Sequence, residues 1–185
     1  SKAGTKVVDM SYNYKTDVLY VLTDKGYLII VDSKSGTIIS ANLVNTGQTS
    51  GTTTTVDKIQ VIDFDNSVYL WSSKTQNPTI YQVDPKTGVV NTANEIKSAS
   101  ATGLASKYLV GLIPLDVNYS IAVTSTSQVG DAASSVNLSL DIVNDKFVKY
   151  ITDSTTQSST SRSTTPKTSE TVSLTSTKGS DIYMN

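Results

Sequence analysis

Two stretches of the chain repeat each other: Val31-Asp32-Ser33-Lys34-Ser35-Gly36-Thr37-Ile38-Ile39 and Val83-Asp84-Pro85-Lys86-Thr87-Gly88-Val89-Val90. The second copy begins 52 residues after the first, and Val, Asp, Lys and Gly occupy the same places in both. Each copy joins two β-branched runs through an Asp-x-Lys-x-Gly segment, which is typical of a turn between strands. The repeat therefore predicts a chain built from similar β-units.

Outward from the first copy, apolar residues alternate with polar ones at a period of two, which is typical of strands. A second turn, Asp24-Lys25-Gly26, precedes the repeat, with Gly26 free to adopt positive φ. The expected strands of this first unit cover residues 6–12, 17–23, 27–32 and 37–43. They predict one antiparallel meander with short turns.

The same pattern recurs twice more, less regularly the last time. We expect three units of four strands at about residues 6–43, 58–91 and 107–152, together forming a domain over residues 1–152. No segment has the apolar spacing of a helix. We expect the following residues to form the core: Val18, Tyr20, Leu28, Ile30, Ile59, Val61, Val68, Leu70, Ile80, Leu109, Ile121, Val123, Leu138 and Leu140.

Repeats of this period, each made of four strands, are the sequence signature of β-propeller blades. The predicted fold is therefore all-β, with successive four-stranded antiparallel meanders arranged as part or a fragment of a propeller. Three units do not close a ring of the usual size. A β-sandwich, in which the sheets pack as an open pair, remains the alternative.

The unit from Leu19 to Gly36 resembles the blade repeat of the quinoprotein-like and YVTN-type β-propellers. In those families an inner strand leads into a D-x-G turn, and the next strand ends in D-x-x-[ST]-G. The resemblance covers residues 6–90 and continues to residue 152 by strand count alone. It implies a propeller-like meander and no particular activity. The family's docking Trp is replaced here, because Ser40 and Asn91 lie in that region.

Ser and Thr dominate the end of the chain. They make up 18 of the 28 residues from 153 to 180, and 27 Ser and 27 Thr occur in the whole chain. A stretch with so few apolar residues cannot offset its ordering entropy by burial. We expect a linker or loop at residues 153–180 and the start of a further strand at residues 181–185.

Composition excludes several classes of function. With no His and no Cys, the chain lacks the usual zinc, haem, thiol and Ser-His-Asp chemistry. A net charge of −1, with a single Arg at Arg162, argues against nucleic-acid binding. No apolar window is long enough for a transmembrane helix, so we expect no membrane insertion. The N-terminal Ser1-Lys2-Ala3-Gly4 has no signal-peptide core.

The candidate site residues are best explained as structural. The repeat turns carry Asp24, Gly26, Asp32, Gly36, Asp84 and Gly88. Their Asp side chains are expected to bond the backbone before Gly, as in Asx turns. Asp63 and Asp65 offer carboxylates to a hard cation, but a hairpin turn explains them better. We expect no catalytic, cofactor-binding or metal-binding residue.

Location is predicted from the hydroxyl-rich composition, which is common on exposed protein surfaces and glycosylated segments. Two N-x-S sequons occur, at Asn118 and Asn137, and are candidates for glycosylation. We expect an extracellular or cell-surface protein.

The predicted function rests on the reactive residue types that the sequence lacks and on strand edges that have no predicted partner strand. We expect a non-catalytic structural or interaction protein, such as a component of a layer, filament or adhesin. Its partners would be other protein chains or the remainder of the same chain, in a homo-oligomer or larger assembly. The alternative is a fragment of a ligand-binding or enzymatic propeller whose site lies in missing blades.

Overall fold

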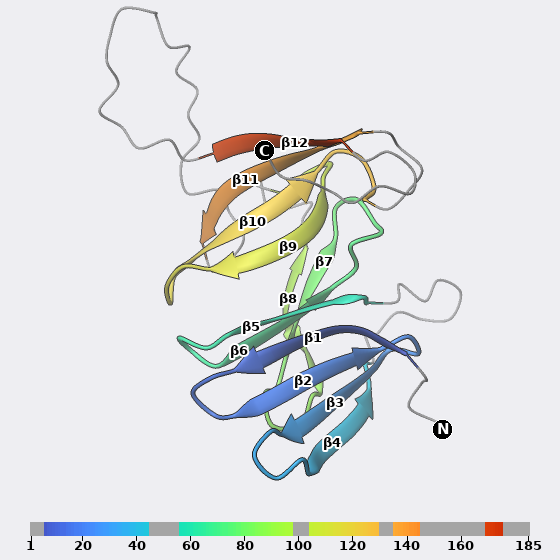
Figure 1. Cartoon of the computed structure of the whole chain (residues 1–185), viewed down its shortest axis with the longest axis vertical. Helices are drawn as coiled ribbons and strands as arrows, with labels where there is room; N and C mark the ends of the chain where they lie inside the picture. The colour runs from blue at the N-terminus through green and yellow to red at the C-terminus, as the bar shows by residue number, and fades with distance from the viewer. Residues whose placement is uncertain (1–5, 45–55, 98–103, 130–134, 145–168, 176–185) are drawn as a thin grey trace, which may run out of the picture.

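The computed structural model describes residues 6–44, 56–97, 104–129, 135–144 and 169–175. Within these ranges the chain is all-β, with twelve strands in three four-stranded antiparallel sheets (Figure 1). The predicted fold class is confirmed. In the described part of the chain no helix is long and apolar enough to cross a membrane.

The first sheet is a meander in the order β1-β2-β3-β4. Its strands are β1 (Val7–Asn13), β2 (Val18–Thr23), β3 (Tyr27–Asp32) and β4 (Ile38–Leu43). Their β-branched and aromatic residues favour a pleated sheet. Ile30 pairs with Ser40 and Val31 with Ile38, so β4 contains a bulge with Ile39 as the extra residue.

The second sheet repeats this order with β5 (Lys58–Ile62), β6 (Ser67–Trp71), β7 (Thr79–Val83) and β8 (Val90–Lys97). Its last strand runs to Lys97, beyond the expected end of the unit at residue 91. The polar residues after Asn91 continue the antiparallel pairing, since Ile96 lies opposite Ile80 and Lys97 opposite Thr79.

The third sheet contains β9 (Tyr108–Pro114), β10 (Tyr119–Ser125), β11 (Ser135–Asn144) and β12 (Ser169–Thr175). The strand β12 pairs with β11, so the expectation of a linker is wrong for these seven residues. Composition concealed their period-two pattern, in which Val172 and Leu174 alternate with Ser and Thr. The expected strand at residues 147–151, the rest of residues 153–180 and residues 181–185 lie outside the described residues.

The first and second sheets enclose one hydrophobic core. Its fully buried members are Tyr20, Leu22, Leu28, Ile30, Val56, Ile59, Val61, Val68, Leu70, Tyr81 and Val83. Most were expected, whereas Val18 is only half-buried at the edge of this core. Burying each large aliphatic side chain contributes roughly 1.5–3 kcal/mol before entropy is counted, so this interface holds the two sheets together.

The second and third sheets enclose another core, in which the expected Ile80 and Leu109 are buried, but the predicted face of β10 and β11 is wrong. The buried residues are Ile62, Tyr69, Trp71, Ile80, Leu104, Leu109, Leu112, Ala122 and Val143. The expected core residues Ile121, Val123, Leu138 and Leu140 lie on the opposite face and are half-buried. The bulky Trp71 and Tyr69 share this core with Ala122, and Thr124 on the same face is also fully buried. Small residues there accommodate the large ones, so the larger aliphatics face outward.

The three sheets are stacked in chain order (Figure 1). The first strands meet at each junction, β1 against β5 and β5 against β9. The described chain is thus a stack of three blade-like sheets, in which the second sheet packs one face against the first sheet and the other face against the third.

Candidate functional site

The two copies of the repeat form the same turn. Asp32 Oδ1 accepts the backbone N–H groups of Lys34 and Ser35 at 2.9 and 3.0 Å. Asp84 Oδ1 accepts those of Lys86 and Thr87 at 2.9 and 2.8 Å. These bonds hold the pKa of each carboxyl below its usual range, with the bond from Ser35 and that from Thr87 contributing most. Both groups are therefore ionised acceptors at neutral pH, which suits a turn and not a general acid.

The glycines that close these turns differ in their surroundings. Gly36 and Gly88 have φ of +70° and +73°, a region that favours glycine. A Cβ at Gly88 would lie 3.2 Å from Leu28 Cδ2 and 3.4 Å from Ile30 Cδ1, whereas one at Gly36 would meet nothing within 4 Å. The second turn is packed on the first sheet, and the first turn has open space beside it.

The remaining predicted turn residues lie in the β2–β3 hairpin. Gly26 has φ +74°, and its N–H donates to the Thr23 carbonyl. Asp24 joins this hairpin to the start of the chain, because its N–H donates to the Lys6 carbonyl and its Oδ1 accepts the Lys6 N–H at 3.3 Å. The structure gives these residues turn and edge contacts.

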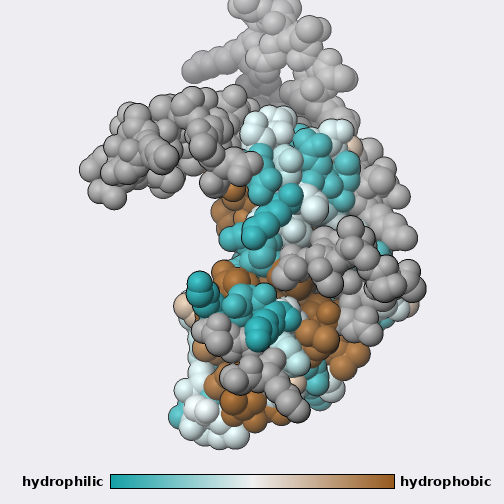
Figure 2. Space-filling view, turned by 90° about the vertical axis from the view of Figure 1, so that its right-hand side faces the viewer, coloured by the Kyte–Doolittle hydropathy of each residue, from teal (hydrophilic) through white to brown (hydrophobic). Residues whose placement is uncertain are grey.

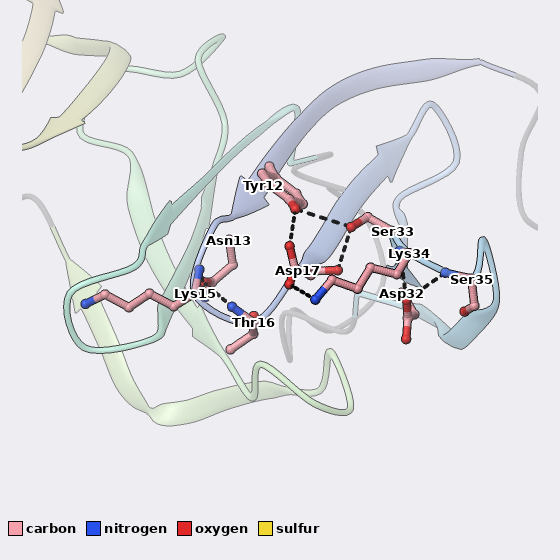
Figure 3. A network of polar contacts seen from close by, with 9 residues as sticks. All are labelled: Tyr12, Asn13, Lys15, Thr16, Asp17, Asp32, Ser33, Lys34 and Ser35. Atoms are coloured by element: carbon pink, nitrogen blue, oxygen red, sulfur yellow. Dashed lines mark hydrogen bonds and ion pairs between the residues drawn. The ribbon is translucent and has the colours of Figure 1, made fainter.

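Beyond the predicted residues, a polar network lies at the end of the first sheet (Figure 3). Asp17 Oδ1 accepts the Tyr12 hydroxyl at 2.7 Å, and Asp17 Oδ2 pairs with Lys34 Nζ at 2.6 Å. The Ser33 hydroxyl donates to the Asp17 carbonyl at 2.8 Å. Lys34, followed by Tyr12, lowers the pKa of Asp17, and Asp17 raises the pKa of Lys34. Each shift moves the pKa away from neutrality, which favours the charged forms that pair in this network.

A neighbouring pair of contacts joins two hairpins of different sheets. The Asn13 side chain donates to Asn66 Oδ1 at 2.8 Å, while Asn13 Oδ1 accepts the N–H of Lys15. The ammonium of Lys15 lies over the ring of Phe64 at 5.4 Å. Asp63 and Asp65, the acidic pair considered for a cation, lie in the turn between β5 and β6, where Asp65 Oδ1 accepts the Ser67 N–H at 3.0 Å. Among the described residues no group of three acidic side chains is placed to hold a metal ion.

Sequence reasoning missed the contacts that lock the first two sheets together. Asp9 Oδ2 accepts the N–H of Ile59 at 2.9 Å, and the Ser11 hydroxyl oxygen accepts that of Val61 at 3.0 Å. An Asp-x-Ser pair on one strand thus satisfies the outward N–H groups of the next sheet's first strand. Polar residues alternate along β1, which was the one local signal for these contacts. The N–H groups that Asp9 and Ser11 bind, however, lie 50 residues further along the chain.

At the other side of the same interface, side chains of β4 hold the β7–β8 turn. The Ser40 hydroxyl and the Asn42 amide both donate to the Thr87 carbonyl. The buried Tyr20 hydroxyl donates to the Pro85 carbonyl at 2.8 Å. Burial, and then the charge of Asp84, raises the pKa of Tyr20, so this phenol stays a neutral donor.

The junction of the second and third sheets is tied differently. Trp71 Nε1 donates to the Leu109 carbonyl at 2.9 Å in a fully buried site. The nearly buried Asp141 pairs with Lys107 Nζ at 3.1 Å. The hydroxyl of Thr124 is buried there without a hydrogen-bond partner. Of these contacts, the Trp71 bond joins the two sheets, whereas the Lys107–Asp141 pair lies within the third sheet.

The side of the first sheet that faces away from the second is an exposed apolar surface. We call seven of the residues that strand pairing places on this side the outer face: Met10, Tyr12, Leu19, Val21, Ile29, Val31 and Ile38. Tyr27, Ala41 and Leu43 of β3 and β4 lie on the same side. All seven are apolar or aromatic, and Met10 and Ile38 are 62% and 60% exposed. Figure 2 shows hydrophobic side chains at the surface of the lower part of the molecule, where this sheet lies.

The two sequons fall in different settings. Asn118 is exposed between β9 and β10, where its N–H donates to Asp116 Oδ1 at 2.7 Å. The backbone of Asn137 lies within β11, opposite Ser173 of β12. Only the first is displayed on a loop, as glycosylation favours. Glycosylation at either position stays a prediction.

Comparison with known proteins adds a structural neighbour. No family model matches the sequence. No curated protein matches it either. The structure is similar to the crystal structure of BamB from Moraxella catarrhalis, with a TM-score of 0.43 and 11% sequence identity. The similarity covers 76% of this chain and 34% of the BamB chain, so the chain spans about a third of that protein.

Proposed function

We propose that this chain is a non-catalytic structural or interaction protein of the cell surface or extracellular space, and that it assembles with other protein chains. The observation that carries the proposal is the exposed apolar edge of the first sheet. The edge strand β4 has no Lys, Glu or Pro, and Ile38, Ile39 and Leu43 are all more than half exposed. Edge strands that stay unpaired are normally protected by charge or Pro.

The backbone of β4 offers donors to a further strand. The Val44 N–H donates to the Gly26 carbonyl at 2.8 Å, so alternate residues Asn42 and Ser40 also bond toward β3. The N–H of Ala41 then points outward from the sheet edge. Pairing with another chain would satisfy it, and this is the edge contact that we propose.

The absence of catalysis is part of the proposal. The acidic groups with shifted pKa values, Asp17, Asp32 and Asp84, are all shifted downward by hydrogen bonds within turns and the surface network. Such groups lack the pKa near neutrality that proton transfer requires. The hydroxyl-rich composition and the exposed sequon at Asn118 support the proposed location.

Analytical ultracentrifugation of the wild-type chain at micromolar concentration tests the proposal. We expect species heavier than the 19.7 kDa monomer. Ala41→Pro removes the outward N–H and should lower the average mass, whereas Ala41→Val keeps the N–H and should not. A wild-type chain that remains monomeric, or that turns over a substrate, would overturn the proposal.

A further inference from the structure

We propose that the outer face of the first sheet is the docking surface for a second copy of this chain, which contacts it through the outward face of its third sheet. The inference rests on the proposed function, because it names the faces through which the chain would assemble head to tail.

The repeat aligns the two sheets strand by strand. Val31 corresponds to Val83 and Ile38 to Val90, and strand pairing extends this correspondence across each sheet. The seven outer-face positions of the first sheet correspond to Ile59, Val61, Val68, Leu70, Tyr81, Val83 and Val90 in the second. All seven of these residues belong to the core against the first sheet, with Val90 partly buried at its edge. The second sheet thus packs against the first sheet through this face. The equivalent face of the first sheet points outward.

The turn at Gly36 supports the same conclusion. At the equivalent Gly88, a Cβ would press against Leu28 and Ile30 of the neighbouring sheet. Gly36 has the same positive φ and nothing within 4 Å of a Cβ. The first sheet therefore presents both the apolar face and the adjacent turn of a sheet junction, without a neighbour in the described part of the chain.

The third sheet presents the aliphatic face that would contact the outer face of another copy. In the third sheet, Ile113, Ile121 and Ile142 lie side by side on the face opposite the core. Val123 and Leu140 continue the same face, and Ile113 is 50% exposed. None of these residues belongs to either described core. The stack therefore begins and ends in aliphatic sheet faces, which matches the composition of the faces buried within it.

A contact between two different faces is heterologous, which gives the proposal a distinctive signature. A copy with a blocked first face still offers its third sheet, and a copy with a blocked third sheet still offers its first. Mixing two such copies restores one contact and yields a dimer that cannot grow. A self-complementary interface would not be restored by mixing.

The experiment uses Met10→Glu and Ile113→Glu, each in an Ala41→Pro background that removes edge pairing. Val89→Glu is the matched control, because Val89 is 58% exposed and lies in a turn outside both faces. We expect each face variant alone to be monomeric, with association weakened at least about 100-fold, since burying an unpaired carboxylate costs several kcal/mol. The control should associate like the Ala41→Pro parent, and the mixture of the two face variants should form a dimer by ultracentrifugation. Circular dichroism checks that each variant is folded.

The possible failures are separable. If the wild-type chain assembles but the Ala41→Pro parent or the mixture is monomeric, the head-to-tail contact is overturned and the proposed function stands. If Met10→Glu or Ile113→Glu leaves assembly unchanged, the named faces are overturned. If the wild-type chain is itself monomeric, both the contact and the proposed function are overturned.

Discussion

Asp9 on β1 accepts the backbone N–H of Ile59 on β5 at 2.9 Å, so a carboxylate of one sheet completes the hydrogen bonding of the next sheet's first strand. With Ser11 and Val61 two residues further on, this contact sets the register between the first two sheets. The interface therefore depends on specific polar contacts at its edge as well as on its hydrophobic core.

Replacing Asp9 tests that contact. Asp9→Ala leaves the part-buried N–H of Ile59 unpaired, and we expect a loss of about 1–3 kcal/mol in the free energy of unfolding. Asp9→Asn keeps an acceptor oxygen and should lose less. Urea denaturation measures both, with Asp63→Ala in the β5–β6 hairpin as a control. Equal stability of Asp9→Ala and wild type would contradict the proposed role.

The two repeat glycines should respond differently to alanine. Gly36→Ala places a side chain at positive φ, which costs about 1–2 kcal/mol. Gly88→Ala carries the same cost and also presses on Leu28 and Ile30, so we expect a larger loss. Urea denaturation of the two variants in the monomeric Met10→Glu, Ala41→Pro background gives the difference. In that background, a Gly36→Ala variant as unstable as Gly88→Ala would contradict the packing of the second turn on the first sheet.

The surface network predicts a dependence of stability on pH. Lys34 and Tyr12 lower the pKa of Asp17 in the folded chain from its ordinary value of 3.8. Its contribution is therefore complete above that value and is lost as the pH falls through the folded pKa. Asp17→Asn should flatten the acid side of the stability profile measured by urea denaturation. A profile unchanged by this substitution would mean that the ion pair does not form in solution.

Trp71 offers a probe of the second and third sheets. It is the single Trp of the chain, and its indole donates to the Leu109 carbonyl in a buried site. We expect blue-shifted fluorescence that moves to the red on unfolding. Trp71→Phe leaves that carbonyl unpaired and a small cavity, so stability should fall by about 2–3 kcal/mol. Emission typical of solvent-exposed Trp in the native chain would contradict this packing.

What could be predicted from the sequence was local. The Asp32 and Asp84 turns were predictable because the Asp, the bonded N–H groups and the Gly lie within five residues. The contacts of Asp9 and Ser11 were not, since their partners lie 50 residues away and nothing local identifies them.

The third sheet shows why a correct strand can still be given the wrong face. Both faces of β10 carry small or aliphatic residues, so size suggested Ile121 and Val123 as the core. Which face of β10 is buried depends on Trp71 and Tyr69 of the second sheet, which share their core with Ala122. Likewise, β12 was hidden in a Ser/Thr-rich stretch because strand pairing with β11 is a tertiary property.

The central claim, that copies meet through the first and third sheets, is tested most directly by cross-linking. Since the chain has no Cys, Met10→Cys and Ile113→Cys each introduce a single thiol. Stacked sheets lie roughly 10 Å apart, a distance that a short bis-maleimide spans. We predict a cross-linked dimer when the two variants are mixed, little with either alone, and little when Val89→Cys replaces Met10→Cys. Cross-linking of Met10→Cys to itself, or none in the mixture, would contradict the account.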